Sequence, residues 1–357
     1  MRVGVACGGT GGHVLPGLVV AGALKARGHD VTLWLAGKTI ESEIARGWDG
    51  SLEMVPAAGF QETSLLSGAR AALSLFRSFC ECRRRMKVHP PDVLLAMGSY
   101  ASVGPALAAR SLRVPLALHE SNAIPGRAVA MLGPLAEAVA VSFQTAAPRL
   151  KGLRVEHTGF PVRPQIEKLA GAGRSWAGDF TVLVMGGSQG ARILNETAPR
   201  AMALARVSAA NLRVVHLAGS AWADRTRDVY SGLGIPAEVH GFFQDMALLY
   251  GRASLAVARA GAATCSELAI AGLPALFVPL PWAARDHQTA NARAMAEGGA
   301  ADMMPQALLT EERLAEYVVN VYKNPAKLEK MSAAMRRLAV PGAAQKIAEL
   351  VERIGGG

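Results

Sequence analysis

Short apolar runs alternate with helix-length segments along the whole chain. In the first half these runs lie at residues 3–7, 31–35, 92–97, 116–119 and 138–142. The pattern restarts in the second half, with runs at residues 180–185, 212–217, 237–240, 255–258 and 275–278. Alternating strands and helices are typical of a parallel sheet with helices on both faces. The sequence therefore predicts an α/β fold made of two doubly wound, Rossmann-like domains.

Proline and glycine residues separate the two series of strands. Residues 159–164 read Gly-Phe-Pro-Val-Arg-Pro, and the Gly- and Ala-rich residues 169–178 follow. Because both segments interrupt regular structure, we expect domains at residues 1–161 and 162–340. The amphipathic end of the chain, within residues 341–357, could pack on either half. Pro341-Gly342 would let it turn back onto the N-terminal domain.

Composition and charge narrow the class of protein. The chain has 357 residues, of which 51% are apolar and 18% are charged, and this length suits two domains with cores of their own. Met1 leads directly into the first strand, and Pro, Gly or charge interrupts each apolar run, so we expect neither a signal peptide nor a membrane span. The four cysteines lack paired spacing, which argues against zinc and disulfides. A net charge of +10 indicates an anionic partner without identifying it.

Each half opens with a strand, a glycine-rich turn and a helix. The first turn reads Gly-Gly-Thr-Gly-Gly-His at residues 8–13, and the second reads Gly-Gly-Ser-Gln-Gly-Ala at residues 186–191. Glycine lets the backbone approach a phosphate closely. Pro16 places the start of the first helix nearby, and the free amides at a helix N-terminus attract an anion. One such turn is explained equally well by a helix that packs tightly on its strand. Two turns favour phosphate binding, with Ser188 as a phosphate contact or a helix cap.

A dinucleotide site fits the first turn poorly. Val14 stands where the fingerprint would have its third glycine, and the second strand ends in Ala36-Gly37-Lys38 without an acidic residue for a ribose. The chain has no Asp-x-Asp pair and no cluster with metal-ligand spacing. The sequence thus disfavours NAD and predicts no metal and no other cofactor. A bound diphosphate would be neutralised by helix N-termini, loop amides and a cation such as Arg163.

Two segments of the second half carry polar groups. Thr264-x-x-Glu267 fits a capping box, although Glu267 could instead bind ribose hydroxyls, and the pattern alone favours the cap. The proline-rich segment 279–291 delivers Asp286, Gln288 and Asn291 into a helix. These residues could bind a hydroxyl-rich ligand. A helix cap for Asp286 and a solvated helix face for the two amides are the common alternatives.

Five motifs follow one another at the ends of successive predicted strands: residues 8–13, His-Glu-Ser-Asn at 119–122, residues 186–191, Arg-Ala-Gly at 259–261 and Asp-His-Gln at 286–288. Together, over nearly the whole chain, they resemble the MurG family of bacterial N-acetylglucosaminyltransferases, which convert lipid I to lipid II in peptidoglycan synthesis. The resemblance implies a GT-B fold, whose two domains face a cleft, and UDP-N-acetylglucosamine as donor. It also implies inversion at the anomeric carbon without a metal, and an acceptor held in a membrane.

The resemblance assigns roles to individual residues. Glu267 would hold the ribose, which reverses the preference for a cap, and Phe243 would present its backbone to uracil. Phe243 stands where the family often has an aliphatic residue, and Ala263 replaces a larger apolar residue, so the tightness of nucleotide binding stays open. The full set of implied donor contacts is Thr10, Gly11, Gly12, Asn122, Arg163, Ser188, Phe243, Ala262, Ala263, Thr264, Cys265, Ser266, Glu267 and Gln288.

His13 is the first candidate for the general base that takes a proton from the acceptor hydroxyl. It ends the first glycine turn, at the carboxyl edge of the predicted sheet, and imidazole is suited to proton transfer near neutral pH. His119 and Glu120 end another strand of the same sheet and are competing candidates. A structural role for His13, bonded to the loop, is equally compatible with the pattern.

Residues 65–87 combine apolar and basic side chains: Leu65, Leu66, Leu73, Phe76 and Phe79 with Arg70, Arg77, Arg83, Arg84, Arg85 and Lys87. Such a segment could be an interfacial membrane anchor or a packed helix with a solvated basic face. We expect a peripheral protein at the cytoplasmic face of the plasma (inner) membrane. Its expected partners are lipid I and proteins of wall synthesis and division, which would connect it to cell shape. We expect no nucleic-acid partner.

Two other classes stay open. A UDP-sugar epimerase of similar fold would need paired acid and base groups at the sugar, which the sequence does not reveal, and incubation with the donor alone would distinguish it. A non-catalytic nucleotide-binding regulator would bind nucleotide without transferring sugar. Polar loops in both halves favour the enzyme.

Overall fold

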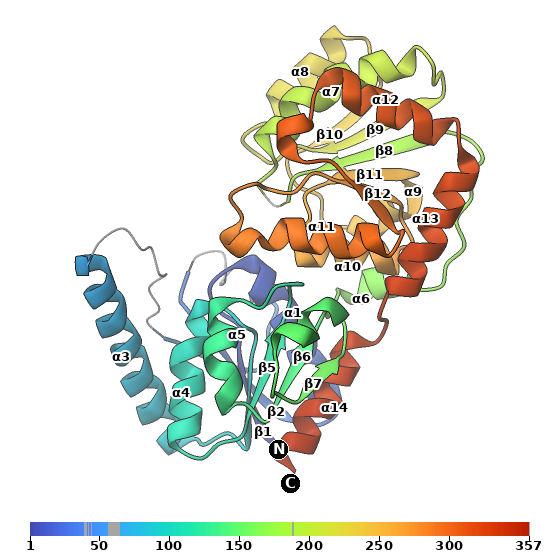
Figure 1. Ribbon diagram of the computed structural model, residues 1–357. Helices are drawn as coiled ribbons and strands as arrows, with labels where there is room; N and C mark the ends of the chain where they lie inside the picture. Colours follow the sequence, from blue (N-terminus) through green and yellow to red (C-terminus); the bar gives the residue numbers. More distant parts are fainter. Residues whose placement is uncertain (39–40, 42, 44, 56–64, 188, 357) are drawn as a thin grey trace. The chain divides into compact units, whose positions relative to one another are not determined.

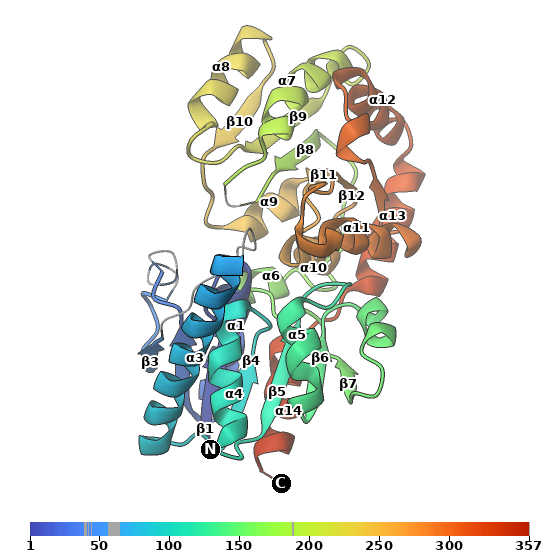
Figure 2. The same cartoon turned by 60° about the vertical axis from the view of Figure 1, so that its left-hand side comes forward.

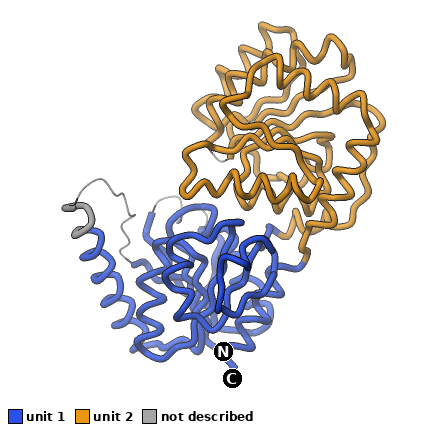
Figure 3. Tube along the Cα trace, in the orientation of Figure 1, with its two compact units in different colours: residues 1–163, 342–357 blue, residues 164–341 orange. Residues whose placement is uncertain are grey.

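The computed structural model describes the chain except for residues 39–40, 42, 44, 56–64, 188 and 357. The chain forms two compact units, which are coloured separately in Figure 3. Unit 1 contains Met1–Arg163 together with Gly342–Gly357, and unit 2 contains Pro164–Pro341. The predicted linker contains a short helix, α6 (Pro164–Glu167).

Unit 1 is built on a seven-stranded parallel sheet with the strand order β3-β2-β1-β4-β5-β6-β7. The order reverses between β1 and β4, and in doubly wound sheets such a reversal marks the part of the carboxyl edge where ligands bind. The strands are β1 (Arg2–Ala6), β2 (Asp30–Leu35), β3 (Ser51–Met54), β4 (Val93–Ala96), β5 (Leu116–Glu120), β6 (Ala138–Val141) and β7 (Val155–His157).

Helices cover both faces of this sheet (Figures 1 and 2). One core contains side chains of α1 (Gly11–Ala26) and α14 (Ala343–Gly355), and the other contains side chains of α3 (Leu65–Val88), α4 (Val103–Ser111) and α5 (Arg127–Leu132). Three short helices in the described part of this unit are η1 (Tyr100–Ser102), η2 (Gly133–Leu135) and η3 (Gln144–Arg149).

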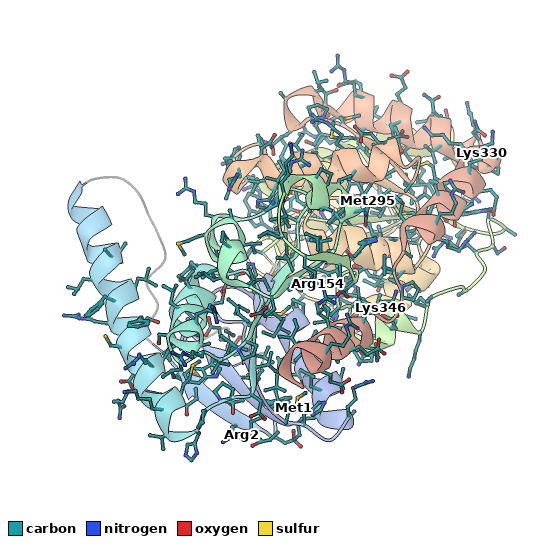
Figure 4. The ribbon with its side chains drawn as sticks, turned by 60° about the horizontal axis from the view of Figure 1, so that its bottom comes forward. Met1, Arg2, Arg154, Met295, Lys330 and Lys346 are labelled. Atoms are coloured by element: carbon teal, nitrogen blue, oxygen red, sulfur yellow. The ribbon has the colours of Figure 1, made fainter. Side chains whose placement is uncertain are left out.

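The end of the chain packs within unit 1. Ile347, Leu350 and Val351 of α14 are fully buried in the same core as Leu24 of α1. In Figure 4, Lys346 marks α14, and Met1 and Arg2 mark the start of β1. The Glu352 carboxylate accepts hydrogen bonds from the Arg27 guanidinium at 2.6 and 2.7 Å, which ties the last helix to the end of α1.

Unit 2 contains a six-stranded parallel sheet with the order β10-β9-β8-β11-β12-β13, which reverses between β8 and β11. Its core on one face is formed with α7, α8 and α12, while α9, α10 and α11 lie on the other face (Figure 1). The strands are β8 (Phe180–Met185), β9 (Leu212–Leu217), β10 (Ala237–His240), β11 (Leu255–Ala258), β12 (Ala275–Phe277) and β13 (Ala301–Met303). The helices are α7 (Arg192–Arg206), α8 (Ala223–Gly232), α9 (Met246–Arg252), α10 (Ala262–Ile270), η4 (Ala284–Asp286), α11 (His287–Glu297), η5 (Gln306–Leu308), α12 (Glu311–Tyr322) and α13 (Pro325–Leu338).

The predicted pair of doubly wound parallel sheets is confirmed. All ten predicted strands are present, and the sequence missed β3, β7 and β13. These three lie at sheet edges and are short and only partly buried, so they do not produce a continuous apolar run. Pro16 lies inside α1, which begins at Gly11, and not near its first residue as the sequence suggested.

Candidate active site

The predicted site residues lie after the carboxyl ends of the strands, in loops or at the start of the following helix. In unit 1 these positions follow β1, β5 and β7, and they carry Thr10 to His13, Asn122 and Arg163. In unit 2 they follow β10, β11 and β12, and they carry Phe243, residues 262–267 and Gln288. Ser188, in the loop after β8, lies outside the described residues.

The first glycine turn is shaped by close packing. A Cβ atom on Gly8 would come within 2.5 Å of the Ala36 nitrogen, and one on Gly17 would come within 2.3 Å of the Cys7 Cβ. Gly9 has a φ of +117°, a conformation that other residues rarely adopt. The glycines at 8, 9 and 17 are thus explained by the path of the chain. Thr10 and Gly12 are exposed, and Gly11 is half-buried.

A buried carboxylate that the sequence did not reveal supports this turn. Glu41 is 0% exposed, and its oxygens accept hydrogen bonds from the Gly9 amide at 2.6 Å and the Ala36 amide at 2.7 Å. On the other side, the Lys38 Nζ donates to the Gly9 carbonyl at 3.1 Å. The Gly9 amide is therefore bound to protein, and an anion at this turn would depend on the amides that follow it.

His13 is half-buried in the first turn of α1. Its Nδ1 lies 2.9 Å from Thr10 Oγ1, and its backbone amide donates to the Thr10 carbonyl at 2.9 Å. When Nδ1 carries the proton and donates to Thr10, the lone pair that can accept a proton is on Nε2. The side chain therefore has a local structural contact that is also compatible with a role as a base.

Glu120 is 3% exposed at the end of β5, and it organises the loop that follows. Its Oε1 accepts the Asn122 backbone amide at 2.8 Å, and its Oε2 accepts the Gly126 amide at 2.7 Å. The Asn122 side-chain amide also donates to Oε1, at 3.4 Å. This carboxylate therefore fixes both ends of the segment that carries Asn122.

His119 is fully buried between neighbouring polar groups. Its Nε2 lies 3.1 Å from Ser142 Oγ, and its Nδ1 lies 3.4 Å from Ser121 Oγ. Burial is the main cause that lowers its pKa to about 4, and a hydrogen bond with the Gly159 backbone opposes this only in part. His119 is therefore a neutral interior side chain near pH 7.

The second glycine turn is packed against the loop that follows β9. A Cβ atom on Gly190 would come within 1.8 Å of the Ala218 carbonyl oxygen, so the two backbones touch. Asn195 of α7 donates to the same carbonyl at 2.9 Å, and its Oδ1 lies 3.0 Å from His216 Nε2. Gly187 has a φ of +92° and open space around its missing Cβ. Of the two, only Gly190 is required by packing.

The capping box that the local pattern alone favoured at Thr264 and Glu267 does not form. Helix α10 begins at Ala262 with Gly261 at the N-cap, so Thr264 lies in the first turn and Glu267 in the second. Glu267 is half-buried, and its Oε2 accepts a hydrogen bond of 2.7 Å from the hydroxyl of Tyr250, which is fully buried in α9. The amides of residues 262–264 have no partner within the helix, because the first turn of any helix lacks one.

Residues 262–266 form the opening of this helix. Ala262 and Cys265 are buried, while Ala263, Thr264 and Ser266 are half-buried. Burial raises the pKa of the Cys265 thiol, so it is an uncharged packing group and not a nucleophile. A ligand at this helix end would therefore meet backbone amides and small side chains.

The loop between β12 and α11 has an unusual backbone. Arg285 and Asp286 have φ values of +55° and +54°, and the Asp286 side chain does not cap the helix. The Gln288 Oε1 accepts the Leu280 amide at 3.0 Å, which closes the loop on itself. Asn291 is fully buried and donates to the Ala260 carbonyl at 3.0 Å, so the alternative of a solvated helix face is wrong for this amide.

Contacts with the protein hold two further residues of the motifs and the predicted site, Arg259 and Phe243. Arg259, in the Arg-Ala-Gly motif, is buried and donates to the carbonyls of Val278 and Pro279, each at 3.0 Å. Phe243 is half-buried, and its ring lies edge-on to His240 with 4.8 Å between the centroids. Arg259 therefore holds the start of the loop after β12, and His240 fixes the Phe243 ring.

No group of three or more His, Cys, Asp or Glu side chains among the described residues is arranged to hold a metal ion. None of the helices in the described part of the chain is long and apolar enough to cross a membrane.

Comparison with known proteins identifies relatives over the whole chain. Residues 3–141 match the glycosyltransferase family 28 N-terminal domain, and residues 181–353 match its C-terminal domain. The UDP-N-acetylglucosamine--N-acetylmuramyl-(pentapeptide) pyrophosphoryl-undecaprenol N-acetylglucosamine transferase of Methylococcus capsulatus is 39% identical, over 98% of this chain and 97% of its own. The crystal structure of Acinetobacter baumannii MurG matches with a TM-score of 0.81 and 29% identity, covering 99% of each chain.

More distant structures share the fold. A UDP-N-acetylglucosamine 2-epimerase matches with a TM-score of 0.70 over 100% of this chain and 96% of its own. Its sequence identity is 14%, so this likeness concerns the fold alone.

The buried His119 makes unit 1 sensitive to acid. Its pKa of about 4 in the folded chain is below the ordinary value of 6.5, so the unfolded chain binds more protons as the pH falls between these values. The contribution of His119 to the free energy of unfolding should therefore fall by about 2 kcal/mol between pH 7 and pH 5. Urea unfolding of the protein and of His119→Gln at both pH values measures this contribution. An equal loss in both proteins would contradict it.

Proposed function

The chain belongs to the MurG family within glycosyltransferase family 28, and from this membership we propose that it transfers N-acetylglucosamine from UDP-N-acetylglucosamine to lipid I. Lipid I is N-acetylmuramyl-(pentapeptide) pyrophosphoryl-undecaprenol, and the product is lipid II of peptidoglycan synthesis. The observation that carries the proposal is the 39% identity to a transferase of this name over 98% of the chain. Placement of the shared motifs at the carboxyl edges of two parallel sheets supports it.

We assign the donor mainly to unit 2. The amides that open α10 and the half-buried Glu267 and Gln288 follow adjacent strands, β11 and β12. A helix N-terminus attracts phosphate, while carboxylate and amide groups suit sugar hydroxyls. In this proposal Glu267 holds the ribose, Gln288 holds the sugar, and residues 262–266 with Ser188 and Arg163 contact the diphosphate. Phe243 presents its backbone to uracil.

A transfer assay tests the function as a whole. The purified chain should move labelled N-acetylglucosamine from its UDP donor to a lipid I analogue, and no product should form without that acceptor. Release of an altered UDP-sugar from the donor alone would instead identify an epimerase. Nucleotide binding without transfer would identify a binding protein, and either result would overturn the proposal.

We assign the general base to His13 of unit 1. Its contact with Thr10 supports the role, because a partner at Nδ1 orients the ring, and in the tautomer in which Nδ1 donates to Thr10 the basic atom is Nε2. The alternatives are less suited. His119 is fully buried and has a pKa of about 4, which makes it a weak base. Glu120 accepts backbone amides from the loop that it organises.

Replacement of His13 by Ala should therefore lower turnover by about 10²- to 10⁴-fold, because proton transfer from the acceptor hydroxyl loses its base. The dissociation constant of UDP-N-acetylglucosamine, measured by calorimetry, should change little. Added imidazole should restore part of the rate. Near-normal turnover, or a loss of donor affinity in proportion to activity, would transfer the role to Glu120 or His119.

We further propose that α3 contacts an anionic membrane surface, where an undecaprenyl-linked acceptor would be held. The inner face of the helix is occupied, since Ser78, Cys82 and Met86 are buried. On the outer face, Phe76 is 62% exposed and Leu73 is 50% exposed, beside the exposed Arg77. An exposed apolar pair next to basic residues is suited to the interface of an anionic bilayer.

Other members of the expected anchor have different surroundings. Phe79 is half-buried and packs against the core, Arg83 donates to Ser111, and Arg85 forms ion pairs with Glu53 and Glu81. The side chains of Leu65, Leu66 and Arg70 lie outside the described part of the chain. The proposed contact is therefore confined to the outer face of α3. We also propose a location at the cytoplasmic face of the plasma membrane, near proteins of wall synthesis and division.

The double variant Leu73→Glu/Phe76→Glu should bind anionic phospholipid vesicles at least about tenfold more weakly than the original chain, because a buried apolar side chain of this size is worth about 1.5–3 kcal/mol. A matched control is Leu204→Glu/Val207→Glu, which changes two exposed apolar residues at or next to the end of α7. Flotation of the vesicles measures binding. Equal binding by the two variants would contradict a contact through α3.

A further inference from the structure

Tyr250 and Glu267 form a buried pair beside the proposed donor site. Tyr250 is fully buried in α9, and its hydroxyl donates to Glu267 Oε2 at 2.7 Å. We propose that Tyr250 is a positioning residue, whose hydroxyl holds the Glu267 carboxylate in the orientation that binds the nucleotide ribose. The proposal rests on the donor site assigned above, in which Glu267 contacts the ribose.

The direction of the two helices brings these groups toward the ligand edge of the sheet. α9 begins after the carboxyl end of β10, and α10 begins after the carboxyl end of β11. Side chains on a helix lean toward its N-terminus, so Tyr250 and Glu267 both lean toward the edge where the strands end. A nucleotide bound at the start of α10 would lie on that side.

Glu267 needs such a restraint because its side chain has alternatives. A glutamate loses substantial rotamer entropy when it is fixed. The unpaired amides in the first turn of α10 also attract a carboxylate, and they are the amides that we assign to the donor phosphates. A hydrogen bond from Tyr250 holds the carboxylate in one orientation. A carboxylate has about four acceptor positions, so this bond is compatible with further bonds from the two ribose hydroxyls.

Arg174 links the ends of the two helices through backbone carbonyls. Arg174 Nη1 donates to the Ala271 carbonyl, after the end of α10, at 3.0 Å. Its Nη2 donates to the carbonyl of Tyr250 itself at 2.9 Å and to that of Ala253. Burial lowers the pKa of Arg174 to about 10, which still leaves it charged near neutral pH. Because the helix ends are fixed by Arg174, removal of the Tyr250 hydroxyl should affect mainly the carboxylate.

Tyr250→Phe tests the proposal, because it removes one hydroxyl and keeps the ring that fills the core. Binding of UDP, 2′-deoxy-UDP and 3′-deoxy-UDP to the full chain is measured by calorimetry. We expect the variant to bind UDP about tenfold more weakly, and to bind at least one of the deoxy analogues with nearly the affinity of the original chain. The ratio of the affinity for UDP to the affinity for that deoxy analogue should therefore be smaller in the variant than in the original chain. A purely structural role would weaken all three nucleotides equally.

Tyr317→Phe is the matched control, since Tyr317 is also in unit 2 and donates to a carboxylate oxygen, Asp302 Oδ2, at 2.8 Å. It should leave the affinity ratios unchanged. Glu267→Ala tests the ribose contact separately from the positioning role of Tyr250. If Glu267→Ala loses discrimination between UDP and its deoxy analogues while Tyr250→Phe keeps it, the positioning role is wrong and the donor site stands. If Glu267→Ala keeps discrimination, the ribose contact itself is wrong, and the inference about Tyr250 falls with it.

Discussion

A parallel sheet places the end of every strand and the beginning of every following helix at one edge, and both units of this chain depend on that constraint. Strand carbonyls and the first amides of helices therefore meet in the same loops. These loops need partners for their own backbone groups before they can hold a ligand, since buried amides and carbonyls are costly when unpaired. Charged and amide side chains supply several of those partners in both units.

In unit 1 two carboxylates accept backbone amides of the site loops, while Lys38 donates to the Gly9 carbonyl. Glu41 accepts from Gly9, and Glu120 accepts from Asn122 and Gly126. In unit 2 several anchors donate to carbonyls, as Arg259 does at Val278 and Pro279, while Gln288 accepts the Leu280 amide. Asn195 and Asn291 likewise donate to the carbonyls of residues 218 and 260. Anchors that bind carbonyls keep amides for an anionic ligand, whereas anchors that bind amides remove them. In unit 2 the amides of residues 262–264 have no partner within α10, which agrees with the proposed donor diphosphate there.

The sequence predicted the features that depend on local pattern. Buried parallel strands are continuous apolar runs, so all ten predicted strands exist, while the three missed strands are partly exposed edges. The capping box failed because the small residues before Thr264 already belong to α10. Glu41 and Tyr250 had no sequence signal, since their partners are 32 and 17 residues away and depend on tertiary packing. The order of the motifs indicated the family. The residues that hold the site in place, such as Glu41 and Tyr250, could be found only from the structure.

The loop before α11 shows how hydrogen bonds within the fold can prepare a loop for a ligand. Arg285 and Asp286 are held in left-handed conformations, each at a cost of about 1–2 kcal/mol for an ordinary residue. Such strain persists only where the surroundings over-determine the backbone. Here the carbonyls before the loop are bound by Arg259, the Leu280 amide is bound by Gln288, and the helix after the loop is fixed by Asn291. The loop is thus ordered by the fold before a ligand arrives. A sugar nucleotide that binds to Gln288 would then lose little affinity to ordering the loop, and the strain is offset by hydrogen bonds that the fold already makes.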